Sequence, residues 1–266
     1  MQDRVKSRVA VRREGEYIDL VSNLSMEPNV QDPTFSSSLD QLTLSDRMIR
    51  VFHSPLSSFR AVQQEQSWQD WLLPVVLTSI VWVATNYLTL SVVGNPELPA
   101  LQQRLEALTE EQRVQALESL GMWRQHGWFT MPIVSTFSSL AALGLVLLAL
   151  GRYAFRADVA LRGMLVVKAY AMLVLIPEWI VRTPLILIQQ TPDIKFGPGA
   201  LLSEDIAATF VGRILAGIDF FDVWQGWIMG VGLAVMAGIP TRHGIIAVLA
   251  LWGAWVAVGA LLAVAV

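Results

Sequence analysis

Residues 218–240 of the chain read IDFFDVWQGWIMGVGLAVMAGIP. The stretch begins with two acidic residues, continues through aromatic residues and regularly spaced glycines, and ends at a proline. It is longer than the roughly 20 apolar residues that an α-helix needs to cross a hydrocarbon core about 30 Å thick. The stretch therefore predicts a membrane-spanning helix that packs against other helices.

Four further apolar runs have a similar length, and none has the alternation over about ten residues that is typical of a transmembrane β-barrel strand. The five predicted spans are residues 71–93, 128–150, 161–188, 218–239 and 244–266. Only 15% of the chain is charged, against about 25% in a soluble domain. We expect an all-α, polytopic membrane protein. Its net charge of −3 gives no case for binding nucleic acid.

The distribution of Lys and Arg predicts how the spans are oriented. Basic residues precede the first span, follow the second and follow the fourth, whereas the other two loops are longer and more acidic. Because cytoplasmic loops carry the excess of positive charge, we expect a cytoplasmic N-terminus and an external C-terminus.

The part of the chain before the first span divides into two segments. Residues 1–46 are polar and rich in Ser, Asp and Pro, so we expect a disordered cytoplasmic tail. Residues 47–70 are amphipathic and basic, and Pro55 interrupts them, so we expect an interfacial segment on the inner leaflet. Residues 71–266 form the predicted five-helix membrane domain.

The first external loop predicts two short amphipathic helices on the outer surface. The first follows Pro99, and the second starts with a capping-box pattern at Thr109. Gly121 is the expected end of the second helix, because glycine is common immediately after a helix.

Small residues recur every four positions along the fourth span and again on the fifth. Such spacing lets helix backbones approach closely. We predict that this face packs against the fifth span, which a short turn joins to the fourth. The helix-packing residues are Gly226, Gly230, Ala234, Gly238, Gly253 and Ala257.

The third predicted span carries Lys168, Glu178 and Arg182. Ionisable residues inside a membrane often mark a transport path or a proton relay. Alternatively, Glu178 and Arg182, four residues apart on one face, form a structural pair near the outer interface while Lys168 reaches inward to the headgroups. We also expect Pro177 and Pro184 to kink this helix.

Asp219 and Asp222 lie at the start of the fourth span. Paired acids can perform general acid–base catalysis or bind a cation. A helix N-terminus also favours acidic residues, because its free N–H groups and its dipole attract negative charge. With no cysteine and three isolated histidines, the sequence predicts no metal site and no cofactor.

Three short motifs resemble the Ypt/Rab-interacting-protein (Yip) family, in its prokaryotic branch. Residues 51–55 with Phe59 are similar to the segment before the family's first span, and residues 166–171 are similar to its third span. Residues 217–224, followed by Gly232 and Leu233, resemble its fourth span. The resemblance covers about residues 48–266, although Lys168 is unusual for the family.

The resemblance implies a non-enzymatic integral membrane protein with a YIP-one domain, in the prokaryotic plasma (inner) membrane. Its expected partners are membrane lipids and other integral membrane proteins, an ABC transporter among them, or a second copy of the chain. Residues 1–47 contain no motif of the eukaryotic members, so binding of a Rab-type GTPase is not expected. Two alternatives stay open: a transporter or permease subunit with Lys168, Glu178 and Arg182 on its path, and an intramembrane enzyme that uses Asp219 and Asp222.

Overall fold

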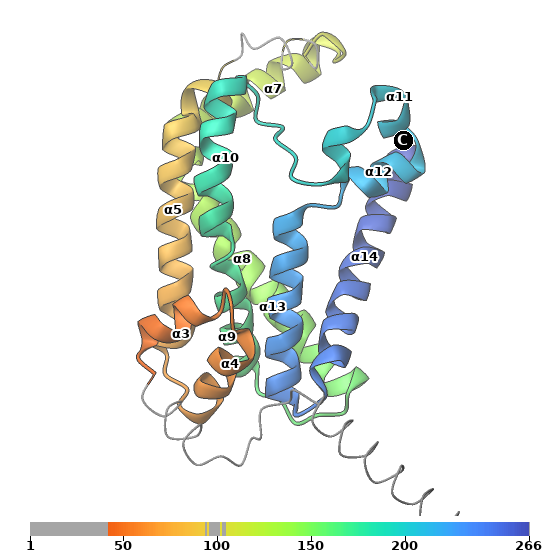
Figure 1. The fold of residues 1–266 in the computed structure, drawn as a ribbon. Coiled ribbons are helices and arrows are strands. Elements are labelled where there is room, and N and C mark those ends of the chain that lie inside the picture. The colour runs from red at the N-terminus through yellow and green to blue at the C-terminus, as the bar shows by residue number, and fades with distance from the viewer. Residues whose placement is uncertain (1–41, 94, 96–101, 103–104, 266) are drawn as a thin grey trace, which may run out of the picture. The chain divides into compact units, whose positions relative to one another are not determined.

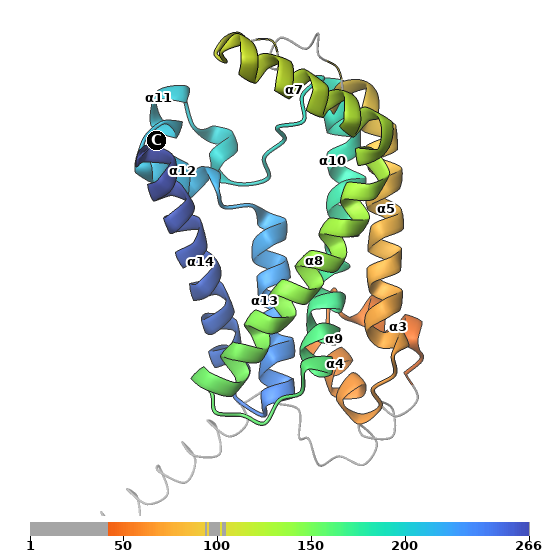
Figure 2. The ribbon, with the colours of Figure 1, turned by 180° about the vertical axis from the view of Figure 1, so that it is seen from behind.

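A computed structural model of the chain describes residues 42–93, 95, 102 and 105–265, which belong to the compact unit Leu42–Val266 (Figures 1 and 2). Every regular element in these ranges is helical. Five of the described helices are long and apolar enough to cross a membrane, which confirms the predicted all-α fold with five candidate spans. Most of the predicted disordered tail, and the start of the helix predicted after Pro99, lie outside the described residues.

The five candidate spans are close to the predicted runs. The first is α5 (Gln69–Val93), and the second is α8 (Trp128–Ala149), which continues into a π-helical turn at Leu150–Ala154. The third consists of α9 (Leu161–Met172) and α10 (Leu175–Gln189). The fourth and fifth are α13 (Phe220–Ala237) and α14 (Thr241–Ala265).

The second span is longer than predicted because α7 (Glu110–Met122) leads into it without a break. Thr109 caps α7 by a capping box, in which Gln112 N donates to Thr109 Oγ1 and Thr109 N donates to Gln112 Oε1. The prediction that Gly121 ends this helix is wrong. A glycine ends a helix when it adopts the left-handed conformation, but Gly121 stays helical, and a π-helical turn at Trp123–Gly127 joins α7 to α8.

The third span breaks at Leu173 and Val174, between α9 and α10. Pro177 lies one turn further on, in the first turn of α10. A proline removes one backbone donor, and its ring clashes with the carbonyl four residues earlier, which here belongs to Leu173. Pro184 is accommodated inside α10 without ending it. The kink predicted at Pro177 is therefore displaced by one turn toward the N-terminus.

Helix α9 is the centre of the bundle. It packs against α5, α8 and α13, and its side chains from Val166 to Ala171 are almost entirely buried. Seen from behind, α8 slants across the bundle and passes in front of α13, and α13 and α14 lie side by side (Figure 2). The half of the third span with the most buried side chains thus also contains Lys168.

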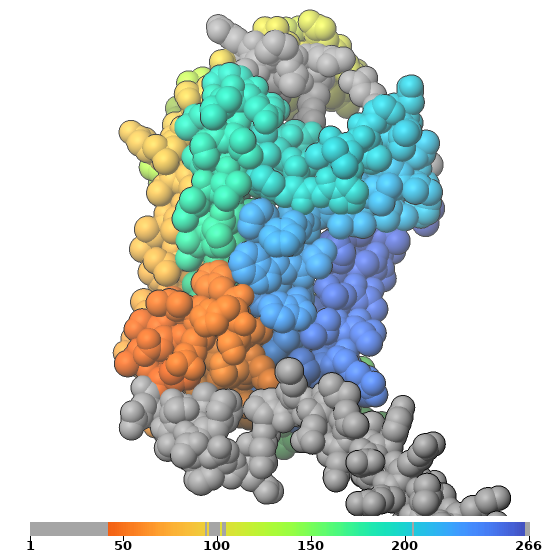
Figure 3. Space-filling view, in the orientation of Figure 1, coloured from red at the N-terminus to blue at the C-terminus, as the bar shows by residue number. Residues whose placement is uncertain are grey.

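The segment before the first span folds onto this bundle. Thr43 caps α3 (Leu44–Arg50), which begins inside the segment predicted to be disordered, and α4 (Pro55–Gln64) follows with Pro55 at its first position. The apolar face of α4 contacts α13 directly (Figure 3). Phe59 is fully buried, with its ring centroid 5.9 Å from that of Tyr170. This face was expected to lie on the inner leaflet, but in the structure it packs into the core of the helix bundle.

Short elements connect α10 to α13: a 3₁₀ turn (Pro198–Leu201), α11 (Glu204–Ala207) and α12 (Phe210–Ala216). The start of this connection returns to the first turn of α13, where Phe220 N donates to Phe196 O over 2.9 Å. A side chain at Gly197 would collide with Ile218 O, so this close approach requires glycine.

Candidate functional site

The backbones of α13 and α14 approach closely where the two spans cross. A Cβ atom at Gly230 would overlap Ile245 Cα and would lie 2.8 Å from Ile245 N. A Cβ atom at Gly244 would lie 2.8 Å from Ala234 Cβ. At Gly226 it would meet only a side-chain end, Leu249 Cδ2, at 2.9 Å. Three of the small residues on the fourth span therefore face the fifth, and their contact is within the chain.

Two of the predicted helix-packing residues do not pack in this way. Gly238 is the C-cap of α13 with a φ of +65°, and an added Cβ atom would have no neighbour within 4 Å. Glycine is needed there for its backbone conformation, which corrects its assignment to the packing face. A Cβ atom added at Gly253 would likewise have no neighbour within 4 Å, so this face of α14 does not contact α13. Ala257 is half-buried on α14.

Arg182 joins the third span to the fourth. Its Nη2 atom lies 2.8 Å from Glu178 Oε1 and 3.1 Å from Asp219 Oδ2, and its Nη1 atom donates to Ile194 O. Its guanidinium also lies over the ring of Phe196, 4.9 Å from the centroid. The fork of donors on an arginine suits such a shared contact. The structure thus brings Glu178, Arg182 and Asp219 together, and we call this set the Arg182 cluster.

Lys168 does not belong to the Arg182 cluster and does not reach toward the headgroups. Its side chain is 2% exposed, and its Nζ atom donates to Gln225 Oε1 of α13 over 2.9 Å. The expected inward reach of Lys168 is wrong, because a polar side chain on the neighbouring span satisfies the ammonium where it lies. The three predicted intramembrane charges therefore occupy two separate environments.

The two acidic residues at the start of α13 also have different surroundings. Asp219 is the N-cap residue, and its Oδ1 atom accepts from Phe221 N over 2.9 Å while Arg182 binds its other oxygen. Asp222 lies in the first turn and lines a cavity of about 870 Å³ between α8, α13 and α14. Within the described ranges no hydrogen bond or ion pair engages the carboxylate of Asp222. One acid is thus structural and the other faces a cavity.

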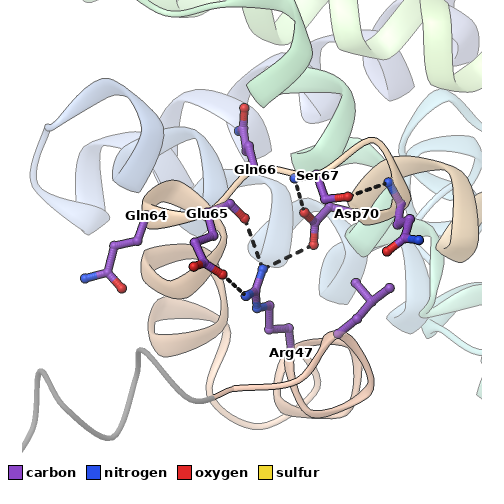
Figure 4. A pocket seen from close by; sticks show the side chains of 8 residues that line it. Arg47, Gln64, Glu65, Gln66, Ser67 and Asp70 are labelled. Carbon is purple, nitrogen blue, oxygen red and sulfur yellow. Dashed lines mark hydrogen bonds and ion pairs between the residues drawn. The ribbon is translucent and has the colours of Figure 1, made fainter.

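A buried polar network ties α3 to the first span, and Figure 4 shows its centre. Arg47 donates to Leu42 O and Glu65 O over 3.1 Å each, and its Nη1 atom lies 3.5 Å from Asp70 Oδ1. Asp70 is completely buried and also accepts from Tyr170 Oη at 3.2 Å and from Ser67 N at 2.7 Å. These contacts fix α3 on the spans, and we call them the Arg47 network.

Sequence reasoning missed Arg47, Asp70 and Tyr170 as a set, and Gln225 and Gly244 as individual residues. Asp70 immediately precedes an apolar run, and Tyr170 lies 100 residues further along the chain, so no local pattern joins them. Gly244 was visible as a small residue at the start of the fifth run. In the part of the chain that the structure describes, no cluster of His, Asp and Glu could hold a metal ion.

Comparison of the chain with protein-family models, with curated proteins and with solved structures gave no match.

Proposed function

We propose that the chain is a non-enzymatic integral membrane protein of the Yip type that serves other membrane proteins as an adaptor, scaffold or accessory subunit. The observation that carries the proposal is the unequal use of the spans. The apolar window of α14 is only 11% buried and that of α8 22%, against 56% for the third span. Most of the apolar surface of the fifth span is therefore not covered by the other helices of the bundle.

The charged groups support an adaptor more than a catalyst. Glu178, Arg182 and Asp219 bind one another, so their charges stabilise the packing of α10 against α13. Asp219 also caps its helix, which leaves Asp222 without a partner acid for acid–base chemistry. Through these contacts, Glu178, Arg182 and Asp219 stabilise helix packing. The resemblance to the Yip family likewise favours a non-enzymatic protein.

The proposal includes a location and an orientation. We place the protein in a prokaryotic plasma membrane because of its resemblance to the prokaryotic branch of the Yip family. We orient it with a cytoplasmic N-terminus because the basic residues flank the spans on that side. Its partner would be another integral membrane protein, such as an ABC transporter, or a second copy of the chain. Binding of a Rab-type GTPase is not part of the proposal.

A transporter subunit is the second candidate, favoured by the cavity at Asp222 and by the buried ammonium of Lys168. A path that uses Glu178 and Arg182 would require their ion pair to open during each cycle. Replacing both residues by Gln should then abolish flux of the transported ion in liposomes. Unchanged flux in the double variant would remove this path from consideration.

Single-cysteine crosslinking tests the adaptor proposal, because the chain has no cysteine of its own. Leu262→Cys places a photo-crosslinker on the exposed face of α14, and Ile80→Cys places one on the exposed face of α5 as a matched control. We expect a protein adduct of defined mass, either a partner or a second copy, from position 262 and not from position 80. Adducts with lipid alone at both positions would refute the proposal.

A second variant separates partner binding from folding. Gly259→Leu adds bulk to α14 three residues from position 262, on the same helix face, where an added Cβ atom would have no neighbour within 4 Å, and Gly121→Leu does the same on α7. Gly259→Leu should leave the protein folded and weaken the crosslink from position 262. Gly121→Leu should change neither property. An unaltered crosslink in Gly259→Leu would place the partner on another face.

A further inference from the structure

The cavity between α8, α13 and α14 is amphipathic. Because α8 and α14 diverge toward the end where α13 begins, they flank the cavity without packing closely along it (Figure 2). Its polar lining comes from Asp222 and Gln225, three residues apart on α13. The remainder is apolar and extends along all three helices, with Leu143, Val146, Leu147, Met229, Leu251, Trp252 and Trp255 among its members.

The polar groups of this cavity have a defined hydrogen-bonding character. Lys168 donates to the amide oxygen of Gln225, so the amide nitrogen of Gln225 remains as a donor. Asp222 contributes a carboxylate, which only accepts hydrogen bonds when it is ionised. Behind them, the ammonium of Lys168 adds a buried positive charge that interacts electrostatically with Asp222. The cavity therefore offers a negatively charged acceptor, the Asp222 carboxylate, beside a hydrogen-bond donor, the Gln225 amide nitrogen. The positive charge of Lys168 lies close to this donor.

We propose that this cavity is a binding site for a phospholipid with a zwitterionic, primary-amine head, of the phosphatidylethanolamine type. The ammonium of the lipid donates to the carboxylate of Asp222. Its phosphate accepts from the amide nitrogen of Gln225 and is attracted by the charge of Lys168. One acyl chain lies along the apolar wall between α8 and α14.

Depth within the bilayer agrees with this arrangement. Asp222 is in the first turn of its span. We place this turn at the depth of the headgroups, and Met229, which also lines the cavity, lies two turns deeper. Seven residues of helix correspond to about 10 Å, so the apolar lining continues from headgroup depth into the acyl-chain region. Two Trp side chains, at positions 252 and 255, form part of that wall.

Charge and hydrogen bonding select among the common headgroups. A phosphatidylglycerol head has no cation for Asp222 and places its negative charge near that carboxylate. A phosphatidylcholine head carries a cation without N–H donors, so it makes no charge-assisted hydrogen bond. The site therefore favours the ethanolamine head over the choline head by about threefold, as expected for one weak hydrogen bond near an interface.

Native mass spectrometry of the full chain tests this inference. The protein is released from vesicles that contain equal amounts of phosphatidylethanolamine, phosphatidylcholine and phosphatidylglycerol with identical acyl chains, and bound lipids are counted. We expect ethanolamine-lipid adducts to exceed choline-lipid adducts about threefold. Asp222→Asn, which preserves size, should reduce that ratio to about one.

Two control variants make the result decisive. Asp193→Asn removes an exposed acid from a loop and should keep the threefold ratio. Leu251→Trp fills the apolar wall at a partly exposed position and should reduce the adducts of all three lipids. A wild-type protein without preference, or an Asp222→Asn variant that keeps the preference, would overturn the inference. Equal losses from Asp193→Asn and Asp222→Asn would overturn it as well.

Discussion

Replacing Gly230 by Ala should destabilise the protein, although the same change in most helices is stabilising. A methyl group at Gly230 would lie 2.8 Å from Ile245 N and 3.0 Å from Gly244 O, where ordinary contact begins at 3.4 Å. Both neighbours are backbone atoms, and the methyl group would also overlap Ile245 Cα, so a rotamer change cannot relieve the overlap and α13 and α14 must separate.

The magnitude follows from two opposing effects. Overpacking of this kind costs about 1–3 kcal/mol, whereas Gly→Ala in a helix returns about 0.5–1 kcal/mol. The free energy of unfolding should therefore fall by up to about 2.5 kcal/mol for Gly230→Ala. Gly253→Ala meets nothing within 4 Å, so it should raise the same quantity by up to about 1 kcal/mol.

Unfolding by SDS in mixed micelles, followed by far-ultraviolet circular dichroism, measures both variants under one condition. Gly226→Ala serves as an intermediate case, because its methyl group would meet only the movable end of Leu249. We expect stability to increase in the order Gly230→Ala, Gly226→Ala, Gly253→Ala. A Gly230→Ala variant as stable as Gly253→Ala would refute the close crossing of α13 and α14.

Three further predictions concern the polar contacts. Arg182→Gln should lower the free energy of unfolding by about 3–5 kcal/mol, because it leaves Glu178 without its buried partner. The double variant Arg182→Gln, Glu178→Gln should lower it by less than Arg182→Gln alone in the same unfolding assay. Asp70→Asn should loosen α3 from the bundle and accelerate tryptic cleavage at Arg50, and unchanged proteolysis would argue against the Arg47 network as the anchor. The Thr43 hydroxyl, and then its backbone N–H, hold the pKa of Asp46 below its ordinary value, so the capping stability is present at neutral pH and is lost as the pH falls through that lowered pKa. Thr43→Ala should raise this pKa in a carboxyl NMR titration.

The sequence was sufficient to predict the spans because length and hydrophobicity alone decide them. The five runs agree with the helices to within a few residues at most ends, since a membrane leaves few alternatives to a long apolar helix. Periodicity also identified the apolar face of α4. It could not identify what covers that face, because Phe59 packs against Gly232 and Tyr170, which are remote in sequence.

The candidate site was only partly predictable, for a related reason. The Glu178–Arg182 pair has a local spacing of four, so it could be inferred, but the third member, Asp219, is 37 residues from Arg182. Gly121 stays helical where a helix end was expected, and Gly238 ends α13 where a packing contact was expected, because a glycine's conformation depends on the chain that follows it. The roles of Asp219, Gly121 and Gly238 depend on tertiary contacts, which a short stretch of sequence does not reveal.

The hydrogen bond between Lys168 and Gln225 has a consequence for biogenesis. The two residues are 57 positions apart. At about 5–20 residues per second, Gln225 is therefore synthesised roughly 3–11 s after Lys168. A lone lysine opposes insertion by about 2.5–3.5 kcal/mol at the centre of a span, and by less at Lys168, which lies in the first third of its span. The third span should therefore remain beside the translocation machinery until the fourth arrives, and the two should enter the lipid together. A nascent chain that ends at residue 217 would carry an unsatisfied ammonium and become a substrate for membrane quality control.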